Sequence, residues 1–322
     1  MIVMDTKVNL EDINVVIVDA DRTSRQTIRN ILTDNGIRNI SVAVNMRDMT
    51  NILDVSSPDL LISDHELPDG DFSDFVHKLR HYETKYNPFL PIVATAWSPT
   101  HETVRSIIQS GVDHIVSKPL SAGQLMQRIK VLALARKPFI VTSQYIGPDR
   151  RKKDDARPSV STPVIVPSTL SMKATGATEI NPASLQEEID ACVKQVNIQK
   201  LERNAQQVSF LVERIVPGLA LGGPDETTSR SLDRLLYVSE DIARRMGGTP
   251  YAHVSELCNT MINVTRKIID AGDFPAPKDV ELLKPVAKSI EAGFAESGEE
   301  AQRMALEISR SVKGGQTKQA RH

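Results

Sequence analysis

The chain has 322 residues, which is long enough for two domains that each bury a core of their own. Its 39 basic and 41 acidic side chains give a formal net charge of −2, so no overall attraction to nucleic acid or to an anionic membrane is expected. No apolar run approaches the roughly 18 residues that crossing a bilayer requires, and the opening segment MIVMDTKVNLED lacks the apolar centre of a signal peptide. The two cysteines, Cys192 and Cys258, lack the spacing of a zinc or redox site. These features predict a soluble, cytoplasmic protein without a membrane partner.

Five short apolar runs alternate with amphipathic stretches in the first part of the chain. The runs are rich in β-branched residues and are apolar on both faces, as the strands of a buried parallel sheet are. They cover residues 14–18, 40–44, 60–63, 92–96 and 114–117. The stretches between them repeat apolar residues at helical spacing. The sequence therefore predicts a doubly wound α/β domain with the order (βα)5 over residues 1–142.

Residues 143–181 differ in composition from the rest of the chain. They contain GPDRRKKDDARP, followed by a segment rich in Ser, Thr and Pro. The basic residues 150–153 are flanked by Asp149, Asp154 and Asp155, which favours a solvated tether over a site for an acidic partner. We predict a flexible linker here.

Helical spacing returns after Pro182 without strand-like runs. Four amphipathic segments, separated by turns rich in Gly and Pro, are found at about residues 183–216, 227–246, 251–271 and 279–312. This pattern predicts an all-α helical bundle domain over residues 182–314 and a disordered tail at 315–322.

Polar side chains follow the strand-like runs at the points where those runs end. Asp19 and Asp21 follow the first run, Asp64 the third and Lys118 the fifth, while Thr95 lies at the end of the fourth. In an open parallel sheet, ligands collect at the carboxyl ends of the strands. A carboxylate nucleophile, a second acid, a hydroxyl and a lone ammonium group are the groups that phosphoryl transfer to aspartate requires.

Residues 13–137 resemble the response-regulator receiver family of two-component signalling. The matching stretches are VVIVDADRTSRQTIRNIL, PDLLISDHELPDGDFSDFVHKLR, PIVATAWS and GVDHIVSKPLS. The resemblance implies that Asp64 is the phosphorylated residue in a phosphorelay. It also implies that Asp19, Asp64 and the backbone carbonyl of Glu66 hold Mg²⁺, that Thr95 contacts the phosphoryl group and that Lys118 is its counter-ion. A sensor histidine kinase or a phosphotransfer protein is the implied partner, and no enzymatic turnover is expected.

Two positions depart from the family pattern. Ala20 stands where a directly metal-ligating acid is expected, so Mg²⁺ binding should weaken. Asp21 is a candidate substitute ligand. Ile115 stands at a position that is usually aromatic in the family. Two hypotheses remain open: a phosphorylatable receiver, and a degenerate receiver that acts as a scaffold without phosphorylation.

The second half of the chain admits three interpretations. Residues 227–271 resemble a histidine phosphotransfer domain, but Glu240 stands at the position of its phosphorylated histidine, and a packing or surface role is expected for His253. The stretch SEDIARRMGGTPYAHVSEL also resembles a helix-turn-helix, but residues 181–322 carry 18 basic and 20 acidic side chains, so DNA binding is not expected. A helical domain for dimerisation or partner docking is preferred. Surface or packing roles are expected for the histidines at positions 65, 77, 81, 101 and 114.

Overall fold

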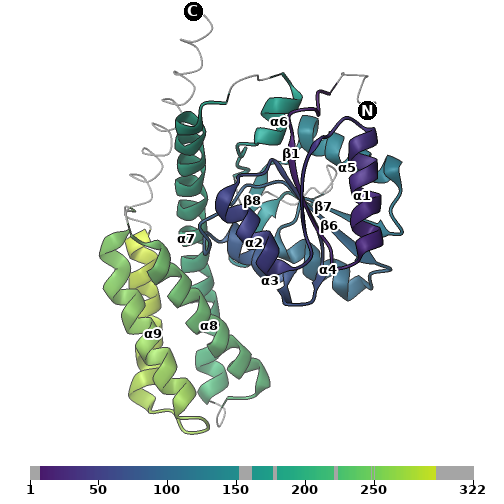
Figure 1. Ribbon diagram of the computed structural model, residues 1–322. Coiled ribbons are helices and arrows are strands. Elements are labelled where there is room, and N and C mark those ends of the chain that lie inside the picture. The colour runs from purple at the N-terminus through teal and green to yellow at the C-terminus, as the bar shows by residue number, and fades with distance from the viewer. Residues whose placement is uncertain are drawn as a thin grey trace, which may run out of the picture. The chain divides into compact units, whose positions relative to one another are not determined.

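The structure is a computed structural model, which describes residues 8–151, 162–176, 180–220, 224–247, 249 and 251–294. The chain divides into two compact units (Figure 1). The first unit comprises the residues up to 140 together with 145–192, and the second comprises 141–144 together with the residues from 193 onward. The tail expected at residues 315–322 lies outside the described part of the chain.

The first unit is built on a parallel sheet of five strands. The strands are β1 (Asn14–Val18), β2 (Asn39–Ala43), β3 (Leu60–Asp64), β6 (Ile92–Trp97) and β7 (His114–Lys118). They are paired in the order β2-β1-β3-β6-β7, and each pair is parallel. The strand order reverses direction between β1 and β3, which is where open sheets of this kind bind ligands.

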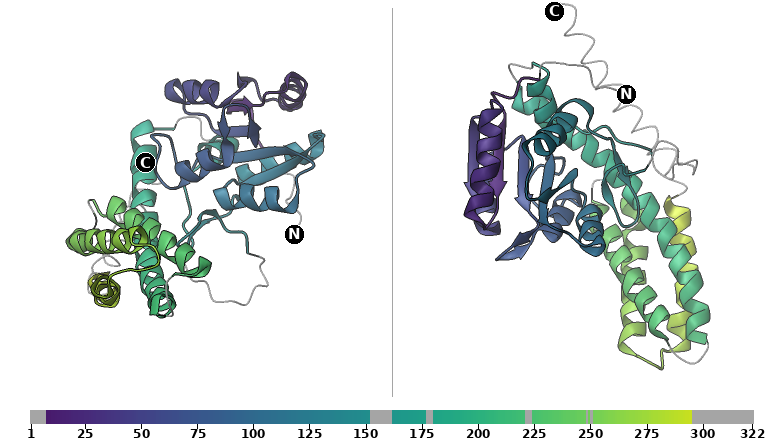
Figure 2. Two further views of the ribbon diagram at one scale, coloured as in Figure 1. Left: turned by 90° about the horizontal axis from the view of Figure 1, so that it is seen from below. Right: turned by 90° about the vertical axis from the view of Figure 1, so that its right-hand side faces the viewer.

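Helices cover both faces of this sheet (Figures 1 and 2). They are α1 (Arg22–Asp34), α2 (Met46–Val55), α3 (Phe72–Arg80), α4 (His101–Ser110) and α5 (Ala122–Ala135). One apolar core joins α1 and α5 to sheet residues such as Ile17 and Ile62, and another joins α2, α3 and α4 to residues such as Val16 and Leu61. Because neighbouring residues of a strand point to opposite faces, the central strand β1 is apolar on both faces from residue 15 to residue 18. The prediction of a parallel sheet flanked by helices is confirmed.

Side-chain caps start the helices next to the carboxyl ends of the strands. The side chains of Asp21, Asp71 and Thr100 accept hydrogen bonds from backbone N–H groups in the first turns of α1, α3 and α4. Such caps satisfy donors that the helix itself leaves unpaired. A two-stranded antiparallel hairpin of β4 (Glu66–Leu67) and β5 (Gly70–Asp71) joins β3 to α3.

The described residues between 143 and 181 are not a flexible linker, which corrects the sequence-based prediction. Strand β9 (Ile146–Pro148) pairs with β8 (Phe139–Val141), and Phe139 forms an antiparallel bridge with Val164. Helix α6 (Thr169–Ala174) places Leu170 and Ala174 in the core that contains α1 and α5. The apolar residues of this segment, such as Val164 and Leu170, stand among many Ser, Thr and Pro residues, so its composition resembles that of a tether. Residues 152–161 and 177–179 lie outside the described part.

A buried ion cluster connects three segments of the first unit. The Asp113 carboxylate accepts hydrogen bonds from Arg80 at 3.1 Å, from Arg136 at 2.8 and 3.1 Å, and from the backbone N–H of Ile92 at 2.9 Å. These partners hold the pKa of Asp113 below its usual value against the opposing effect of its burial. The Phe139 ring lies 5.2 Å from each guanidinium carbon.

The second unit is largely helical. It contains most of α7 (Pro182–Ala220), together with α8 (Glu226–Arg245), the short helix η1 (Ala252–Val254), α9 (Ser255–Asp270) and a helical segment at residues 277–294. Residues of α7, α8, α9 and 277–294 share one apolar core. The boundary between the units falls at residue 193, inside α7, and not at residue 182. No helix within the described residues has the length and apolar character needed to span a membrane.

Candidate functional site

The register of the sheet places the predicted site residues along one edge. Asp64 pairs with Thr95 across β3 and β6, and Val18 pairs with Ser63, so that Asp19 directly follows β1 at the level of Asp64. Strand β7 ends at Lys118. Three elements that are distant in the sequence therefore bring two carboxylates and an ammonium group to the carboxyl edge of the sheet.

Lys118 contacts both carboxylates. Its Nζ donates a hydrogen bond to Asp19 Oδ2 at 2.6 Å and to Asp64 Oδ2 at 2.5 Å, and all three side chains are buried. One ammonium shared between two carboxylates leaves a net negative charge in a poorly solvated site. Burial raises the pKa of Asp19, Lys118 opposes that effect, and repulsion from Asp64 adds to it.

Thr95 places a hydroxyl beside this cluster. It is buried in β6, and its Oγ1 lies 3.4 Å from the backbone carbonyl oxygen of Ser63, a long contact that leaves the hydroxyl weakly held. The backbone N–H of His65 donates to the Thr95 carbonyl at 3.0 Å and fixes the start of the loop after β3. A hydroxyl in this position can turn toward a group attached to Asp64.

Glu66 approaches Asp64 through its backbone. Its N–H lies 3.5 Å from Asp64 Oδ1, while its side chain is exposed to solvent. The main chain of Glu66 therefore lies beside Asp64, and the role of its carbonyl oxygen as a metal ligand stays a prediction.

Asp21 is not part of the cluster around Lys118. Its carboxylate caps α1 by accepting a hydrogen bond from the backbone N–H of Ser24 at 2.6 Å, an interaction that lowers the pKa of Asp21. The backbone N–H of Asp21, in contrast, donates to Asp19 Oδ1 at 2.8 Å and orients that carboxylate. Asp21 thus serves the site as a helix cap and a backbone donor.

Arg25, which was not among the predicted site residues, contacts the loop after β1. Its guanidinium donates to the backbone carbonyls of Asp19 at 2.6 Å and Ala20 at 2.8 Å. A basic residue in the first turn of the helix after the site is the signal that could have identified it. Arg25 holds the backbone of the loop that carries Asp19.

Two further residues concern the site: Trp97, and Ile115, which departs from the family pattern in the sequence. Trp97, at the end of β6, is 57% exposed, and its ring centroid lies 5.6 Å from Lys118 Nζ. Ile115 is partly buried and packs against the core formed with α2, α3 and α4. The aromatic ring at the site therefore comes from β6.

Comparisons with known proteins find matches to the part of the chain that forms the sheet and its helices. Residues 15–130 match the family model described as the response regulator receiver domain. The chain is 28% identical over 118 residues to the KDP operon transcriptional regulatory protein KdpE of Escherichia coli K12, covering 37% of this chain and 50% of that protein. It is 29% identical over 126 residues to response regulator Rre1 of Synechocystis, covering 39% and 53%. The chain thus spans about half the length of these relatives.

The same part of the chain is similar to receiver domains in solved structures. The receiver domain of Francisella response regulator 1452 is 23% identical with a TM-score of 0.34, covering 38% of this chain and 96% of that one. The receiver domain of sensor histidine kinase PA1611 from Pseudomonas aeruginosa PAO1, described with a magnesium ion in its active site cleft, is 16% identical with a TM-score of 0.33, covering 36% and 92%.

The family match covers the strands that carry the clustered side chains. It extends from β1 to α5 and includes Asp19, Asp64, Thr95 and Lys118. Residues 15–130 of this chain are therefore a response regulator receiver domain.

Proposed function

We propose that Asp64 accepts a phosphoryl group from a sensor histidine kinase or from a phosphotransfer protein. The observation that carries the proposal is the contact of Lys118 Nζ with both Asp19 and Asp64, beside the Thr95 hydroxyl. An Asp64 oxygen attacks phosphorus as the bond from phosphorus to the donor nitrogen breaks. Lys118 then neutralises the phosphoryl oxygens, and Thr95 donates a hydrogen bond to one of them.

The residues present fit a Mg²⁺ ion, with fewer ligands than the family pattern supplies. Mg²⁺ in proteins binds through one or two carboxylates and keeps several waters. Asp19, Asp64 and the backbone carbonyl of Glu66 would hold it here, and the ion would supply positive charge to the phosphoryl oxygens. Ala20 contributes no carboxylate, and Asp21 is held in its cap. A lost contact between unit charges at 4 Å is worth about 4 kcal/mol at an effective dielectric constant of 20. We therefore expect weak Mg²⁺ binding.

A second candidate function is a degenerate receiver that acts as a scaffold. The missing acid at Ala20 favours it. In this case the receiver surface binds its partner without phosphorylation.

We propose that the second unit is a four-helix bundle that docks a partner or a second copy of the chain, and that the protein turns over no substrate. The shared core of its helices supports a folded module. The alternative of DNA binding through these helices is disfavoured by their surplus of acidic side chains. At the position compared with a phosphorylated histidine, the Glu240 side chain forms an ion pair with Arg266 on α9.

Phosphorylation of Asp64 can be tested with the chain's only tryptophan. Beryllofluoride mimics a phosphoryl group on aspartate, so adding it with Mg²⁺ should draw Lys118 toward the new negative charge. That movement should change the emission of Trp97, whose ring lies 5.6 Å from Lys118 Nζ. The measurement is a fluorescence titration of the full chain.

The control is Asp64→Asn, which keeps the side-chain size and should show no response. Acetyl phosphate should correspondingly label the wild type and not this variant, as read by intact-protein mass. If neither reagent changes the wild-type protein, the scaffold function is the correct one.

A further inference from the structure

The β8–β9 hairpin contributes residues to both compact units. Its strands, apart from Val141, belong to the first unit, whereas its tip, residues 141–144, belongs to the second. The two strands and the tip are one continuous stretch of chain. A displacement of the strands therefore reaches the tip through the backbone itself.

The strands of the hairpin pack directly on the turn that precedes β7. Gly111 follows α4 with a positive φ of 99°, and a Cβ atom on it would lie 2.7 Å from the carbonyl oxygen of Ile146. A Cβ atom on Gly147 would lie 3.0 Å from Gly111 Cα. The guanidinium of Arg150 donates a hydrogen bond to the carbonyl of Val112. Because the two backbones touch without a side chain between them, the hairpin and this turn move together.

The tip of the hairpin is held by side chains from two helices of the second unit. Lys200 Nζ on α7 donates to the carbonyl of Thr142 at 3.1 Å, and Arg234 on α8 donates to the carbonyl of Ser143 at 2.8 Å. The hydroxyl of Ser143 donates to Gln207 Oε1 on α7 at 3.2 Å. Hydrogen bonds from charged donors are stronger than those between neutral groups. Two such bonds attach the tip to α7 and α8.

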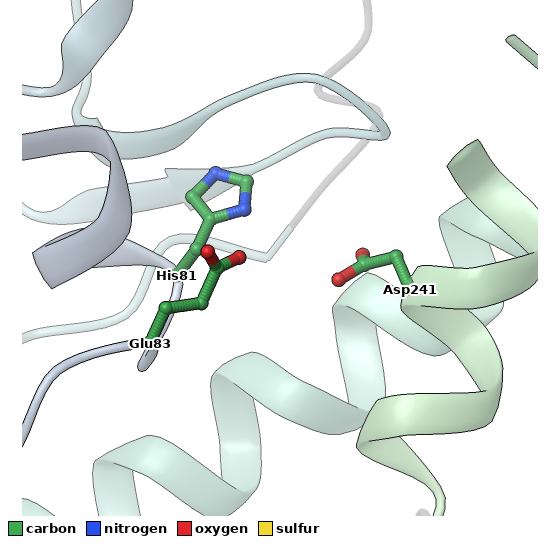
Figure 3. A group of neighbouring side chains, drawn as sticks. All are labelled: His81, Glu83 and Asp241. Carbon is green, nitrogen blue, oxygen red and sulfur yellow. The ribbon is translucent and has the colours of Figure 1, made fainter. Parts of the chain in front are cut away.

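Helices α7 and α8 are also bonded to each other next to these contacts. The Asp241 carboxylate on α8 (Figure 3) accepts a hydrogen bond from Asn204 Nδ2 on α7 at 2.8 Å, and both side chains are buried. Asn204 follows Lys200 by four residues, so the two lie on the same face of α7. His81 and Glu83, which Figure 3 also draws, belong to the first unit and form no part of this contact. A displacement of the tip therefore acts on both helices.

We propose that the β8–β9 hairpin couples the turn before β7 to helices α7 and α8, so that loosening one of them lowers the stability of the other. The turn leads directly into the strand that ends at Lys118, and Lys118 binds Asp64. The coupling itself does not require phosphorylation. Its use as a signal rests on the proposed function: a phosphoryl group on Asp64 draws Lys118 and thereby β7, and the hairpin passes this shift to the second unit.

The test is amide hydrogen exchange of the full chain, measured by mass spectrometry. The double variant Lys200→Met, Arg234→Gln removes both cationic contacts at the tip. It should speed exchange about fivefold or more in the turn before β7, since coupling energies between sites are of that size. The decisive amide is that of Asp113, which donates to the Ile92 carbonyl at 2.9 Å and lies outside the hairpin.

The matched control is Lys194→Met, Arg230→Gln, which changes the same residue types at exposed positions of α7 and α8 and should leave exchange in the turn unchanged. Gly147→Ala tests the opposite direction. It forces the hairpin away from the turn and should speed exchange in α7 and α8, because coupling is reciprocal. Far-UV circular dichroism verifies that each variant is folded. Faster exchange confined to residues 141–145 in the first double variant would overturn the proposal, as would an equal effect of the control.

Beryllofluoride with Mg²⁺ separates this proposal from the phosphoryl-acceptor function. A change in Trp97 emission together with altered exchange in α7 and α8 supports the signal. A change in Trp97 emission with unaltered exchange in these helices overturns it and leaves phosphorylation of Asp64 intact. If Trp97 does not respond, the phosphoryl-acceptor function fails, and the tip and Gly147→Ala variants still decide the coupling.

Discussion

Replacing Lys118 by methionine is expected to lower the free energy of unfolding of the first unit by about 3–5 kcal/mol without Mg²⁺. The side chain is buried and donates to Asp19 at 2.6 Å and to Asp64 at 2.5 Å. Methionine fills a similar volume but leaves two desolvated carboxylates facing each other without a cation. The cost is that of uncompensated buried charge, since the apolar part of the side chain is retained.

Urea unfolding of the full chain, followed by Trp97 emission, measures this effect because the only tryptophan lies in the first unit. Adding Mg²⁺ should stabilise Lys118→Met more than it stabilises the wild type, since a cation then meets both unpaired carboxylates. Lys130→Met, on the exposed face of α5, is the control and should change stability by less than about 0.5 kcal/mol. If Lys118→Met matches the wild type in stability with and without Mg²⁺, the ion pairs of Lys118 with Asp19 and Asp64 do not stabilise the receiver.

Leu170→Ala should destabilise the first unit by about 3 kcal/mol. Leu170 is 0% exposed, and α6 places it in the core that contains α1 and α5. The alanine side chain would leave a cavity among residues that belong to the receiver. The segment after α5 therefore contributes to the stability of the domain that carries Asp64.

Ile165→Ala provides a matched control, because Ile165 lies five residues away and is 86% exposed. It should change stability by less than about 0.5 kcal/mol. The same urea experiment compares the two variants. A stability for Leu170→Ala within this margin of the Ile165→Ala value would mean that α6 does not complete the receiver core.

The sequence was sufficient to predict which side chains lie together at one edge of the sheet, because of how a parallel sheet is built. Asp64 and Lys118 follow apolar runs, and Thr95 lies at the end of one, so knowing that the runs form neighbouring strands places all three along one edge. The structure adds the hydrogen bonds of these side chains, which the spacing of residues in the sequence does not predict. The sharing of Lys118 between two carboxylates and the use of Asp21 as a helix cap depend on side-chain geometry.

The segment after α5 could not be predicted from composition, since its structure depends on tertiary contacts. Val164 is tied to Phe139 by a single bridge, and Leu170 is buried by helices that lie far away in the sequence. A helix of six residues is too short to show a periodic pattern or to be stable alone. Its fold is imposed by the surface on which it packs.

The hydrogen bonds of the Asp113 carboxylate affect how the receiver domain unfolds. It is bonded at once to α3 through Arg80, to the residue after α5 through Arg136, and to the first residue of β6 through the N–H of Ile92. Detaching any one of these segments alone leaves charged groups in a dry interior, which is more costly than separating apolar surfaces. The three segments are consequently tied into one cooperative unit, whose amide protons should exchange with solvent together and not one element at a time.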